Sequence, residues 1–407
     1  MNEKNLPLSG IKVVELSTVV AAPTAARVLA AYGADVIKVE GLKGDVLRRF
    51  GDSYQVTAID GVNPFFTLSN SGKKFISIDL KSEEGMEAMY RLLGQADVFL
   101  SNVRGKSLKK LGLDYESLKD KFPGLICAHF TGFGNTGPDK DRPGYDTCAF
   151  WLRCGSMLDW QIPGSFPIRP VYGFGDMATS AQLVSGVLMA LIGREKTGKG
   201  AEVSVSLLAN GLWLNSFGIV SAQPPFDRPF MVDESKPFDA FSDYYQCKDG
   251  SWIGIFANEY TKEREKLAKA FDMPELLTDP ECANITIMRE SHALERMSVR
   301  LREVFRTKTR EEWCDILRDV DIAYEKLMHY NEIYLDEHAK INGYLEDVVF
   351  DDGSVTVMPA PPIEFEGYDK METVSTGRIS EHASEILEEA GYSEEEIANM
   401  IKKGIIG

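Results

Sequence analysis

Asp176 stands in a setting that suits catalysis as well as structure. It lies in the run Val171-Tyr172-Gly173-Phe174-Gly175-Asp176-Met177-Ala178, and the apolar residues that follow predict a long helix over 177–192. An Asp at a helix start is most often a cap. The same position suits a nucleophilic carboxylate, because helix N–H groups favour its ionised form and the glycines before it admit a bulky electrophile.

Two glycine-rich motifs resemble nucleotide-binding loops but lack their structural context. Residues 132–137 read G-x-G-x-x-G after a strand, yet Pro138 and the run Asp141-Arg142-Pro143-Gly144 predict a loop where a dinucleotide site needs a helix. Residues 193–199 resemble a P-loop, but Gly200 follows Lys199 where Ser or Thr is required. Neither motif therefore predicts a nicotinamide or nucleoside-triphosphate site.

Histidines and cysteines show no spacing typical of metal ligands or of Ser-His and Cys-His catalysis, so no metal is expected. Without a Cys-x-x-Cys pair, all six cysteines are expected to be free buried thiols of a reducing cytoplasm. These cysteines are Cys127, Cys148, Cys154, Cys247, Cys282 and Cys314.

The charge of the chain is unevenly distributed. Its net charge is −17, but residues 1–150 hold 19 Lys and Arg against 18 Asp and Glu, so the acidic excess lies beyond Phe150. Such a chain lacks the clustered basic face of a nucleic-acid or anionic-membrane binder. The near-neutral first part can still hold local cations for a phosphorylated small ligand. No membrane-spanning run and no secretory signal are evident, so we expect a cytoplasmic protein.

The elements that must position these residues alternate between strand and helix over the first 210 residues. Such repeated β–α–β units imply an α/β fold with a parallel, doubly wound sheet, whose ligands bind beyond the carboxyl ends of the strands. Strands are predicted at 11–16, 36–39, 75–80, 98–100, 125–130 and 202–206, and helices at 22–31, after Ser82 and from Asp114.

The pattern changes near Pro224-Pro225. A hairpin over 243–256 and helices at 261–271, 291–305 and 310–318 predict a smaller α+β domain over residues 226–335. Residues 1–225, completed by a C-terminal segment 336–407, are expected to form the large Rossmann-like domain. In that segment a hairpin surrounds Asp351-Asp352-Gly353, and Ser393 with the acids after it predicts a capped final helix.

With these motifs in view, the chain resembles the class III (CaiB/BaiF) CoA-transferases, the group of formyl-CoA, carnitine-CoA and 2-hydroxyacid CoA-transferases. The resemblance spans nearly the whole chain. The stretch from Asn102 to Arg153 is most similar to the branch of amino-acid fermentation that transfers CoA to 2-hydroxyisocaproate or phenyllactate. The motifs that carry it are Pro7-Leu8-Ser9-Gly10-Ile11-Lys12-Val13-Val14-Glu15-Leu16 with Ala22-Pro23, Gly33-Ala34-Asp35-Val36-Ile37-Lys38-Val39-Glu40, Asp79-Leu80-Lys81, Gly112-Leu113-Asp114-Tyr115, Arg142-Pro143-Gly144-Tyr145-Asp146 and the Asp176 run.

The resemblance implies a mechanism and a set of partners. Asp176 would attack an acyl-CoA thioester to give an aspartyl anhydride and then an aspartyl-CoA thioester, which a 2-hydroxy acid would accept. No tightly bound cofactor is implied, since coenzyme A enters as a thioester substrate. The family also implies an interlocked homodimer, and a dehydratase partner is an open alternative alongside catalysis.

The resemblance further implies residues around the substrate. Lys81, Asn102 and Lys110 fall on positions that contact CoA, and we add Arg104 and Arg142 as neighbouring cations suited to phosphate. Asp146 falls on a position that is acidic in relatives, although an Asp after Gly-Tyr is also typical of a turn. The apolar residues Val19, Val20, Phe65, Phe66 and Trp151 suggest an acyl pocket, although core packing explains such residues equally.

The chain departs from the family at two points. Gly41 follows Glu40 where some relatives have an adenine-binding Arg, which leaves Lys43 or Arg48 as substitutes. Residues 221–242 contain no poly-glycine run of the kind that covers the aspartate in the formyl-CoA branch.

Three alternatives stay open for the function. One is a cinnamoyl-CoA:phenyllactate or carnitine-type transferase. Another is an α-methylacyl-CoA racemase, disfavoured because Tyr145 stands where racemases have the histidine of Gly-His-Asp. The last is a non-catalytic CoA-binding subunit of a dehydratase complex.

Overall fold

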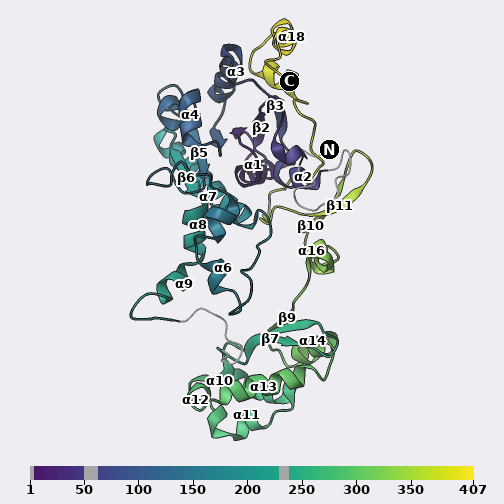
Figure 1. The fold of residues 1–407 in the computed structure, drawn as a ribbon. Helices are drawn as coiled ribbons and strands as arrows, with labels where there is room; N and C mark the ends of the chain where they lie inside the picture. The colour runs from purple at the N-terminus through teal and green to yellow at the C-terminus, as the bar shows by residue number, and fades with distance from the viewer. Residues whose placement is uncertain (1–3, 50–62, 229–237) are drawn as a thin grey trace. The chain divides into compact units, whose positions relative to one another are not determined.

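The computed structural model describes residues 4–49, 63–228 and 238–407. The chain divides into two compact units (Figure 1). The first comprises Met1–Trp160, Pro167–Phe230 and Glu337–Gly407, and the second comprises Gln161–Phe166 and Met231–Asp336. The second unit is thus made of two segments that interrupt the sequence of the first.

A parallel six-stranded sheet forms the centre of the first unit, as the alternating sequence pattern predicts. The strand order is β3-β2-β1-β4-β5-β6, so the direction of winding reverses between β1 and β4. In such sheets the ligand site lies beyond the carboxyl ends of the strands at this reversal. The strands are β1 (Lys12–Leu16), β2 (Asp35–Glu40), β3 (Lys74–Ser77), β4 (Val98–Ser101), β5 (Ile126–Thr131) and β6 (Glu202–Ser206).

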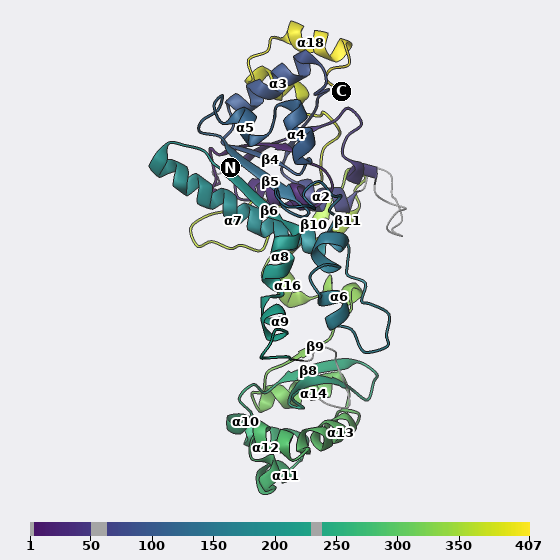
Figure 2. The same ribbon diagram turned by 60° about the vertical axis from the view of Figure 1, so that its left-hand side comes forward.

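The central strands contribute apolar side chains to both faces of the sheet, because successive residues of a strand point in opposite directions. Val13 and Leu100 belong to one core cluster, whereas Val14 and Phe99 belong to another. Helices α1 (Ala21–Ala31) and α7 (Phe174–Thr197) complete the first cluster, and α3 (Glu83–Gly94), α17 (Ala383–Glu389) and α18 (Glu394–Lys402) complete the second. In Figure 2, α3 and α18 lie on one side of the strands and α7 lies on the other.

Shorter elements connect this framework. The remaining helices of the first unit are α2 (Pro64–Asn70), α4 (Gly105–Leu111), α5 (Tyr115–Leu118), α6 (Ser156–Asp159), α8 (Leu207–Leu214), α9 (Ser216–Ser221) and α16 (Glu337–Ile341), with the 3₁₀ turn η1 (Val46–Arg49) and the π-helical turn η3 (Asp146–Trp151). Strands β10 (Leu345–Val349) and β11 (Val355–Pro359) form the predicted hairpin.

The second unit combines a small antiparallel sheet with helices. Strands β7 (Ser242–Gln246), β8 (Trp252–Phe256) and β9 (Tyr324–Lys326) form an antiparallel sheet with its own core. Its helices are α10 (Tyr260–Phe271), α11 (Glu275–Thr278), α12 (Ile285–Glu290), α13 (Ala293–Phe305), α14 (Arg310–Asp319) and α15 (Tyr330–Ile333), with the 3₁₀ turn η4 (Pro280–Cys282).

Three sequence expectations were wrong. The long helix begins at Phe174 instead of Met177, which places Asp176 inside its first turn. The stretch before it is not only a loop, since it contains η3 and α6. Cys148 is exposed, whereas the other five cysteines are buried.

Among the described residues, α7 alone is long and apolar enough to cross a membrane by length and composition. Leu183, Val184 and Val187 of this helix are buried in the core cluster that α1 shares. Packing on the sheet therefore accounts for much of its apolar character.

Candidate active site

A cavity of about 890 Å³ opens at the carboxyl ends of the central strands, where the winding of the sheet reverses. Its lining includes Thr18 after β1, Asn102 after β4 and both buried aspartates of the sequence analysis, Asp146 and Asp176. The topology of the sheet thus brings together residues that lie far apart in the sequence.

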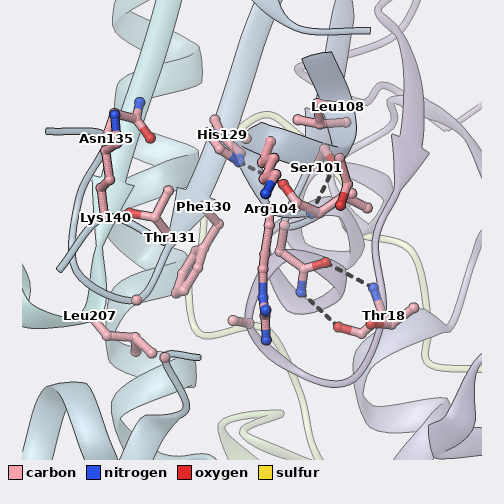
Figure 3. Close-up of a pocket in the computed structure, with 18 of the residues that line it drawn as sticks. Thr18, Ser101, Arg104, Leu108, His129, Phe130, Thr131, Asn135, Lys140 and Leu207 are labelled. Carbon is pink, nitrogen blue, oxygen red and sulfur yellow. Dashed lines mark hydrogen bonds between the residues drawn. The ribbon is translucent and has the colours of Figure 1, made fainter. Parts of the chain in front are cut away.

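Asn102 joins the two loops at the reversal point (Figure 3). Its amide nitrogen donates to the carbonyl of Thr18 at 2.8 Å, and its amide oxygen accepts the N–H of Thr18 at 3.0 Å. This side chain therefore fixes the cavity wall. One amide hydrogen stays available for a ligand, since each amide hydrogen of Asn forms its own bond.

Asp176 lies in the first turn of α7, beyond the N-cap residue Gly173, and its carboxylate does not cap the helix. It lines the cavity although only 8% of its surface is exposed. Burial and, to a smaller extent, the charge of Asp146 together raise its pKa to about 7. Desolvation thus opposes the ionised form of this carboxylate, which the helix N–H groups were expected to favour.

Asp146 is the second buried carboxylate of the cavity and is 5% exposed. It begins η3, and its Oδ1 accepts the backbone N–H of Gly175 at 3.1 Å. Burial raises its pKa to about 6, while hydrogen bonds from the Gly175 and Gly173 backbone oppose that shift. Asp146 therefore does more than form a turn, because it anchors the residue that precedes Asp176.

Glycine is required at two positions beside the aspartate. Gly173 has a φ of 75°, in the left-handed region that side chains rarely adopt. A Cβ atom on Gly175 would lie 2.2 Å from Asp146 Oδ1 and 2.5 Å from Phe150 Cγ. The absence of side chains here thus allows η3 and α7 to pack in direct contact.

Cations line one part of the cavity. They come from α4 with its N-cap residue and from the loop between β5 and η3, and they are Arg104, Lys106, Lys109, Lys140 and Arg142. Figure 3 shows Arg104 and Lys140 on separate elements around the cavity. Lys106, Lys109 and Lys140 were not predicted from the sequence, although the last lies three residues after the G-x-G-x-x-G motif.

Two predicted CoA contacts lie elsewhere. Lys81 and Lys110 are exposed, and neither is among the described residues that line this cavity. Lys81 follows β3 at an edge of the sheet, and Lys110 lies in the last turn of α4. Their contact with CoA stays a prediction.

The G-x-G-x-x-G segment has a structural role in this cavity. A Cβ atom on Gly132 would lie 2.4 Å from Gly144 Cα, so the two backbones cross where only glycines fit. This crossing closes the base of the loop that carries Lys140 and Arg142. Within the loop, Arg142 donates to Asp139 at 3.1 Å and stacks on Phe133 with its Cζ 5.0 Å from the ring centroid.

The apolar residues proposed for an acyl pocket separate into two groups. Val19 and Val20 line the cavity, although Val20 is also buried in the core cluster of Phe66 and Val19 packs against that cluster. Phe66 and Trp151 are buried in core clusters, and Phe65 packs on the cluster of Phe66. Core packing thus accounts for these three aromatic residues.

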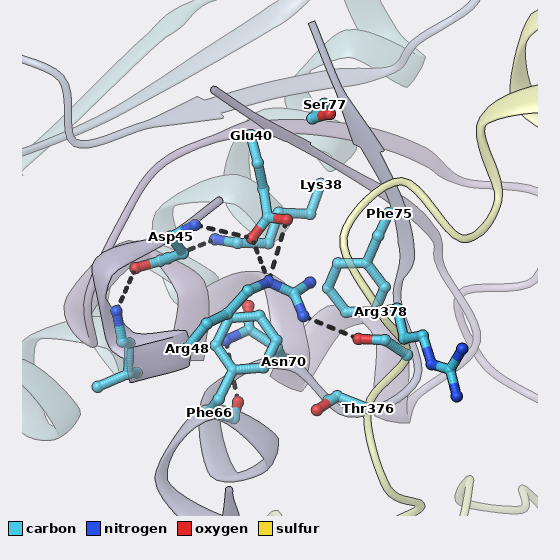
Figure 4. Close-up of polar contacts among 12 residues, drawn as sticks. Lys38, Glu40, Asp45, Arg48, Phe66, Asn70, Phe75, Ser77, Thr376 and Arg378 are labelled. Atoms are coloured by element: carbon cyan, nitrogen blue, oxygen red, sulfur yellow. Dashed lines mark hydrogen bonds and ion pairs between the residues drawn. The ribbon is translucent and has the colours of Figure 1, made fainter. Parts of the chain in front are cut away.

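Neither substitute for the missing adenine-binding Arg lines the cavity among the described residues. Arg48 is engaged elsewhere (Figure 4): its Nε donates to Glu40 at 3.0 Å, and its Nη1 donates to the carbonyl of Gly377 at 2.8 Å. Its guanidinium also lies 4.0 Å from the ring centroid of Phe66. Lys43 is exposed, so the adenine contact has no assigned residue.

A family model described as CoA-transferase family III matches residues 8–374 of the chain. The protein belongs to this family. Among curated relatives, this family III CoA-transferase is 36% identical over 392 residues to (R)-2-hydroxy-4-methylpentanoate CoA-transferase of Clostridioides difficile, covering 96% of this chain and 97% of the relative. It is 33% identical to cinnamoyl-CoA:phenyllactate CoA-transferase of Clostridium sporogenes over 402 residues, covering 98% and 97%.

The fold of this family III CoA-transferase also matches solved structures. A CAIB/BAIF family protein from Brucella suis superimposes with a TM-score of 0.81 at 29% identity, covering 95% of this chain and all of that one. The protein is therefore an enzyme that uses CoA thioesters as substrates, and the resemblance inferred from the sequence is confirmed.

Proposed function

We propose that this enzyme transfers CoA from an acyl- or enoyl-CoA, such as isocaprenoyl- or isocaproyl-CoA, to a 2-hydroxy acid such as (R)-2-hydroxyisocaproate, and that Asp176 is the nucleophile. The observation that carries this proposal is the buried Asp176 carboxylate in a cavity whose rim bears five cations. A carboxylate whose pKa is near neutral can act as the nucleophile in acyl transfer. Cations around the cavity can bind the phosphates of CoA.

In the first half of the reaction, ionised Asp176 attacks the thioester carbonyl of the donor. The C–S bond breaks, giving an acyl-aspartyl anhydride and the CoA thiolate. The thiolate then attacks the aspartyl carbonyl of the anhydride, which releases the donor acid as a carboxylate and leaves an aspartyl-CoA thioester.

The second half runs these steps in reverse with the acceptor. The carboxylate of the 2-hydroxy acid attacks the aspartyl thioester and displaces the CoA thiolate, which gives a new mixed anhydride. The thiolate attacks the acceptor carbonyl, so the new acyl-CoA leaves and Asp176 is regenerated. Backbone N–H groups in the first turn of α7 are suited to stabilise the oxyanions.

Asp146 raises the reactivity of Asp176 through charge. Two carboxylates in a buried site repel each other, and the repulsion disappears when Asp176 becomes a neutral ester-like group. Acylation is therefore favoured over the resting state. The hydrogen bond from Gly175 to Asp146 maintains this geometry.

The cation rim is suited to the phosphates of CoA. Arg offers a planar fork and Lys a compact charge, and both occur on the rim. Binding energy from this remote part of the substrate offsets the cost of forming an anhydride from a thioester. We assign the phosphates to Arg104, Lys106, Lys109, Lys140 and Arg142.

Val19 and Val20, which line the cavity, are suited to contact an apolar acyl group. The named relatives act on a branched aliphatic and on an aromatic 2-hydroxy acid. We therefore propose an apolar 2-hydroxy acid as acceptor, in amino-acid fermentation of the leucine type in the cytoplasm.

A homodimer is proposed on the evidence of exposed apolar side chains in the first unit. Phe217 is 92% exposed, Trp213 is 71% exposed and Met189 is 70% exposed. They lie on α9, α8 and α7, and an apolar set of this size is typical of a surface that another chain covers. An interlocked dimer would cover it.

The nucleophile is tested by mass spectrometry after incubation with isocaproyl-CoA and hydroxylamine. We expect a hydroxamate adduct on Asp176 in the wild-type enzyme and in the control Asp120→Ala, an exposed aspartate. Asp176→Ala should give neither adduct nor transfer. An adduct mapping to another carboxylate would overturn the assignment.

The reaction type is tested with a panel of thioesters and acceptors. A transferase forms 2-hydroxyacyl-CoA only when both substrates are present, whereas a racemase inverts a 2-methylacyl-CoA without any acceptor. Isocaproyl-CoA with (R)-2-hydroxyisocaproate, phenyllactate or carnitine distinguishes the proposed acceptor class from its alternatives.

A further inference from the structure

Val19 lies in the cavity wall in a strained conformation. Its φ is 70°, in the left-handed region, which is a genuine outlier for a β-branched residue. Such strain persists only where the surroundings impose it, and it clusters at functional sites. The contacts that hold Val19 in this conformation therefore point to a functional role for its position.

Asp45 holds the backbone of Val19 from behind the cavity wall. Both of its carboxylate oxygens lie 3.2 Å from the Val19 nitrogen, and Oδ1 also accepts the N–H of Leu47 at 2.9 Å. Asp45 is 1% exposed, and Lys38 Nζ lies 3.1 Å from its Oδ2 (Figure 4). The strained amide is thus bound to a buried, charge-paired carboxylate.

The buried ion network extends from Asp45 through Lys38 and Glu15 to Lys73. Lys38 Nζ lies 2.8 Å from Glu15 Oε1, and Lys73 Nζ lies 2.6 Å from Glu15 Oε2. All three of these side chains are fully buried. Desolvating four charges costs free energy that their pairing offsets only with excellent geometry, so the network is weak evidence for stability alone.

The network binds the segment that follows β1 and the first turn of α1 at three points. Lys38 donates to the carbonyl of Ser17 at 3.0 Å, Asp45 accepts the N–H of Val19, and Lys73 donates to the carbonyl of Pro23 at 2.8 Å. Three residues between these anchors line the cavity, namely Thr18, Val20 and Ala21. The network thus constrains the position of Val20.

Val20 packs against the turn that precedes the nucleophile. A Cβ atom built on Gly173 would lie 3.4 Å from Val20 Cγ1, and Gly173 is the N-cap of α7, three residues before Asp176. One turn further along the segment, Thr24 lies 3.4 Å from the sulfur of Met177. Val20 and, in the first turn of α1, Thr24 therefore lie close to the helix start on both sides of Asp176.

We propose that Asp45 is a positioning residue for the transfer reaction: through Val19 it sets Val20 against Gly173, and so determines the aim of the Asp176 carboxylate. This inference rests on the proposed role of Asp176. Asp45 does not line the cavity among its described residues, so its effect is transmitted through the Val19 backbone and through Lys38, which holds the carbonyl of Ser17.

The test is a double-mutant cycle of Asp45→Asn and Val19→Gly. Asp45→Asn keeps the shape but loses the charge that Lys38 and the Val19 amide share. We expect kcat to fall about 100-fold while KM for acyl-CoA changes less than about threefold, since a small misplacement near the reacting atoms affects the chemical step. Glycine adopts a φ of 70° without support. When Val19→Gly is added to Asp45→Asn, kcat should therefore rise at least about tenfold, while the urea midpoint of unfolding stays low.

A matched control is Asp97→Asn, at the opposite end of the sheet. Asp97 also accepts a backbone N–H, from Lys12 at 2.8 Å, and pairs with Arg194 at 2.8 Å. We expect it to lower the urea midpoint and leave kcat of the folded enzyme within about threefold. If Asp45→Asn behaves like this control, or if Val19→Gly restores no activity, the positioning role is overturned.

The hydroxylamine assay separates this inference from the proposed function. Asp45→Asn should still form the adduct on Asp176, at a reduced rate. If Asp176→Ala retains transfer activity, the proposed nucleophile is wrong, whatever the result for Asp45.

Discussion

Asp146 accepts a hydrogen bond from the backbone N–H of Gly175 at 3.1 Å, so one buried carboxylate is tied to the residue directly before the other. The two carboxylates belong to segments that meet only in the folded chain, η3 and the first turn of α7. Their separation is thus set by a backbone contact and cannot relax freely when one of them ionises.

The acylation rate should rise with pH. Burial raises the pKa of Asp176 to about 7, and only the ionised form attacks the thioester. We expect single-turnover CoA release to increase from pH 5.5 and to level off above about pH 8. Asp146→Asn removes a neighbouring negative charge, so the inflection should move to lower pH. A flat profile in both enzymes would contradict the assignment.

Asp176→Asn should stabilise the fold at alkaline pH. The folded-state pKa of Asp176 is about 7 against an ordinary 3.8, so the folded protein keeps a proton that the unfolded chain releases. Stability is therefore lost as pH rises through this window. The asparagine variant should exceed the wild type by up to about 4 kcal/mol at pH 8 and by little at pH 4. Urea unfolding at both pH values measures this difference.

Among the glycine-to-alanine substitutions possible in α7, Gly175→Ala should lower activity and stability the most. Its Cβ atom would lie 2.2 Å from Asp146 Oδ1, so η3 and α7 must separate. We expect about 1–3 kcal/mol of destabilisation and at least about 100-fold lower kcat. Gly193→Ala is the matched control, because a Cβ atom there meets open space within 4 Å. It should stabilise the helix by up to about 1 kcal/mol.

Substitution of the rim cations should weaken binding of acyl-CoA. Lys140→Ala is expected to raise KM for acyl-CoA about tenfold with little change in kcat, and to reduce the salt dependence of KM. Lys262→Ala in α10 is the control. Lys81→Ala and Lys110→Ala test which cations bind CoA. Unchanged KM values would favour the cations that line the cavity, and increased values would favour the two lysines predicted from the family motifs.

Gly132→Ala should displace the loop that carries Lys140. The new Cβ atom would lie 2.4 Å from Gly144 Cα. Gly144 Cα is a backbone atom, so it cannot move aside as the end of a flexible side chain can. We expect a higher KM for acyl-CoA together with lower stability. Gly124→Ala, where a Cβ atom meets nothing within 4 Å, should change neither. Equal effects of both variants would contradict a role for the crossing.

The sequence predicted best the features that depend on neighbouring residues. The structure confirms the strands predicted from the apolar runs at β1 and β5, and the N-caps Ser82 and Ser393. Such features could be predicted because a buried strand and a helix cap each depend on a few consecutive residues. The family motifs also directed attention to Asp176 and Asp146, which the fold brings into one cavity.

Features that depend on contacts between distant segments could not be predicted. Nothing near Asp146 marks a π-helical turn, since its packing partner Gly175 lies 29 residues away. Lys140 reaches the cavity because Gly132 and Gly144 cross, and their approach has no local signal beyond two glycines. The burial of Lys38 and Lys73 has no local signal either, since Lys38 stands alone among the apolar residues of β2 and Lys73 lies between Gly72 and Lys74.

The second core cluster of the first unit has a consequence for synthesis of the chain. Ile386, Leu387 and Met400 pack with Ile76 and Met89 in this cluster, which the chain's last two helices complete. A ribosome makes residues 231–336 before any of those helices, so the β3 side of the sheet leaves the exit tunnel long before its cover. Throughout that interval this apolar face of the sheet is exposed in the nascent chain. We therefore expect cotranslational chaperones to bind it.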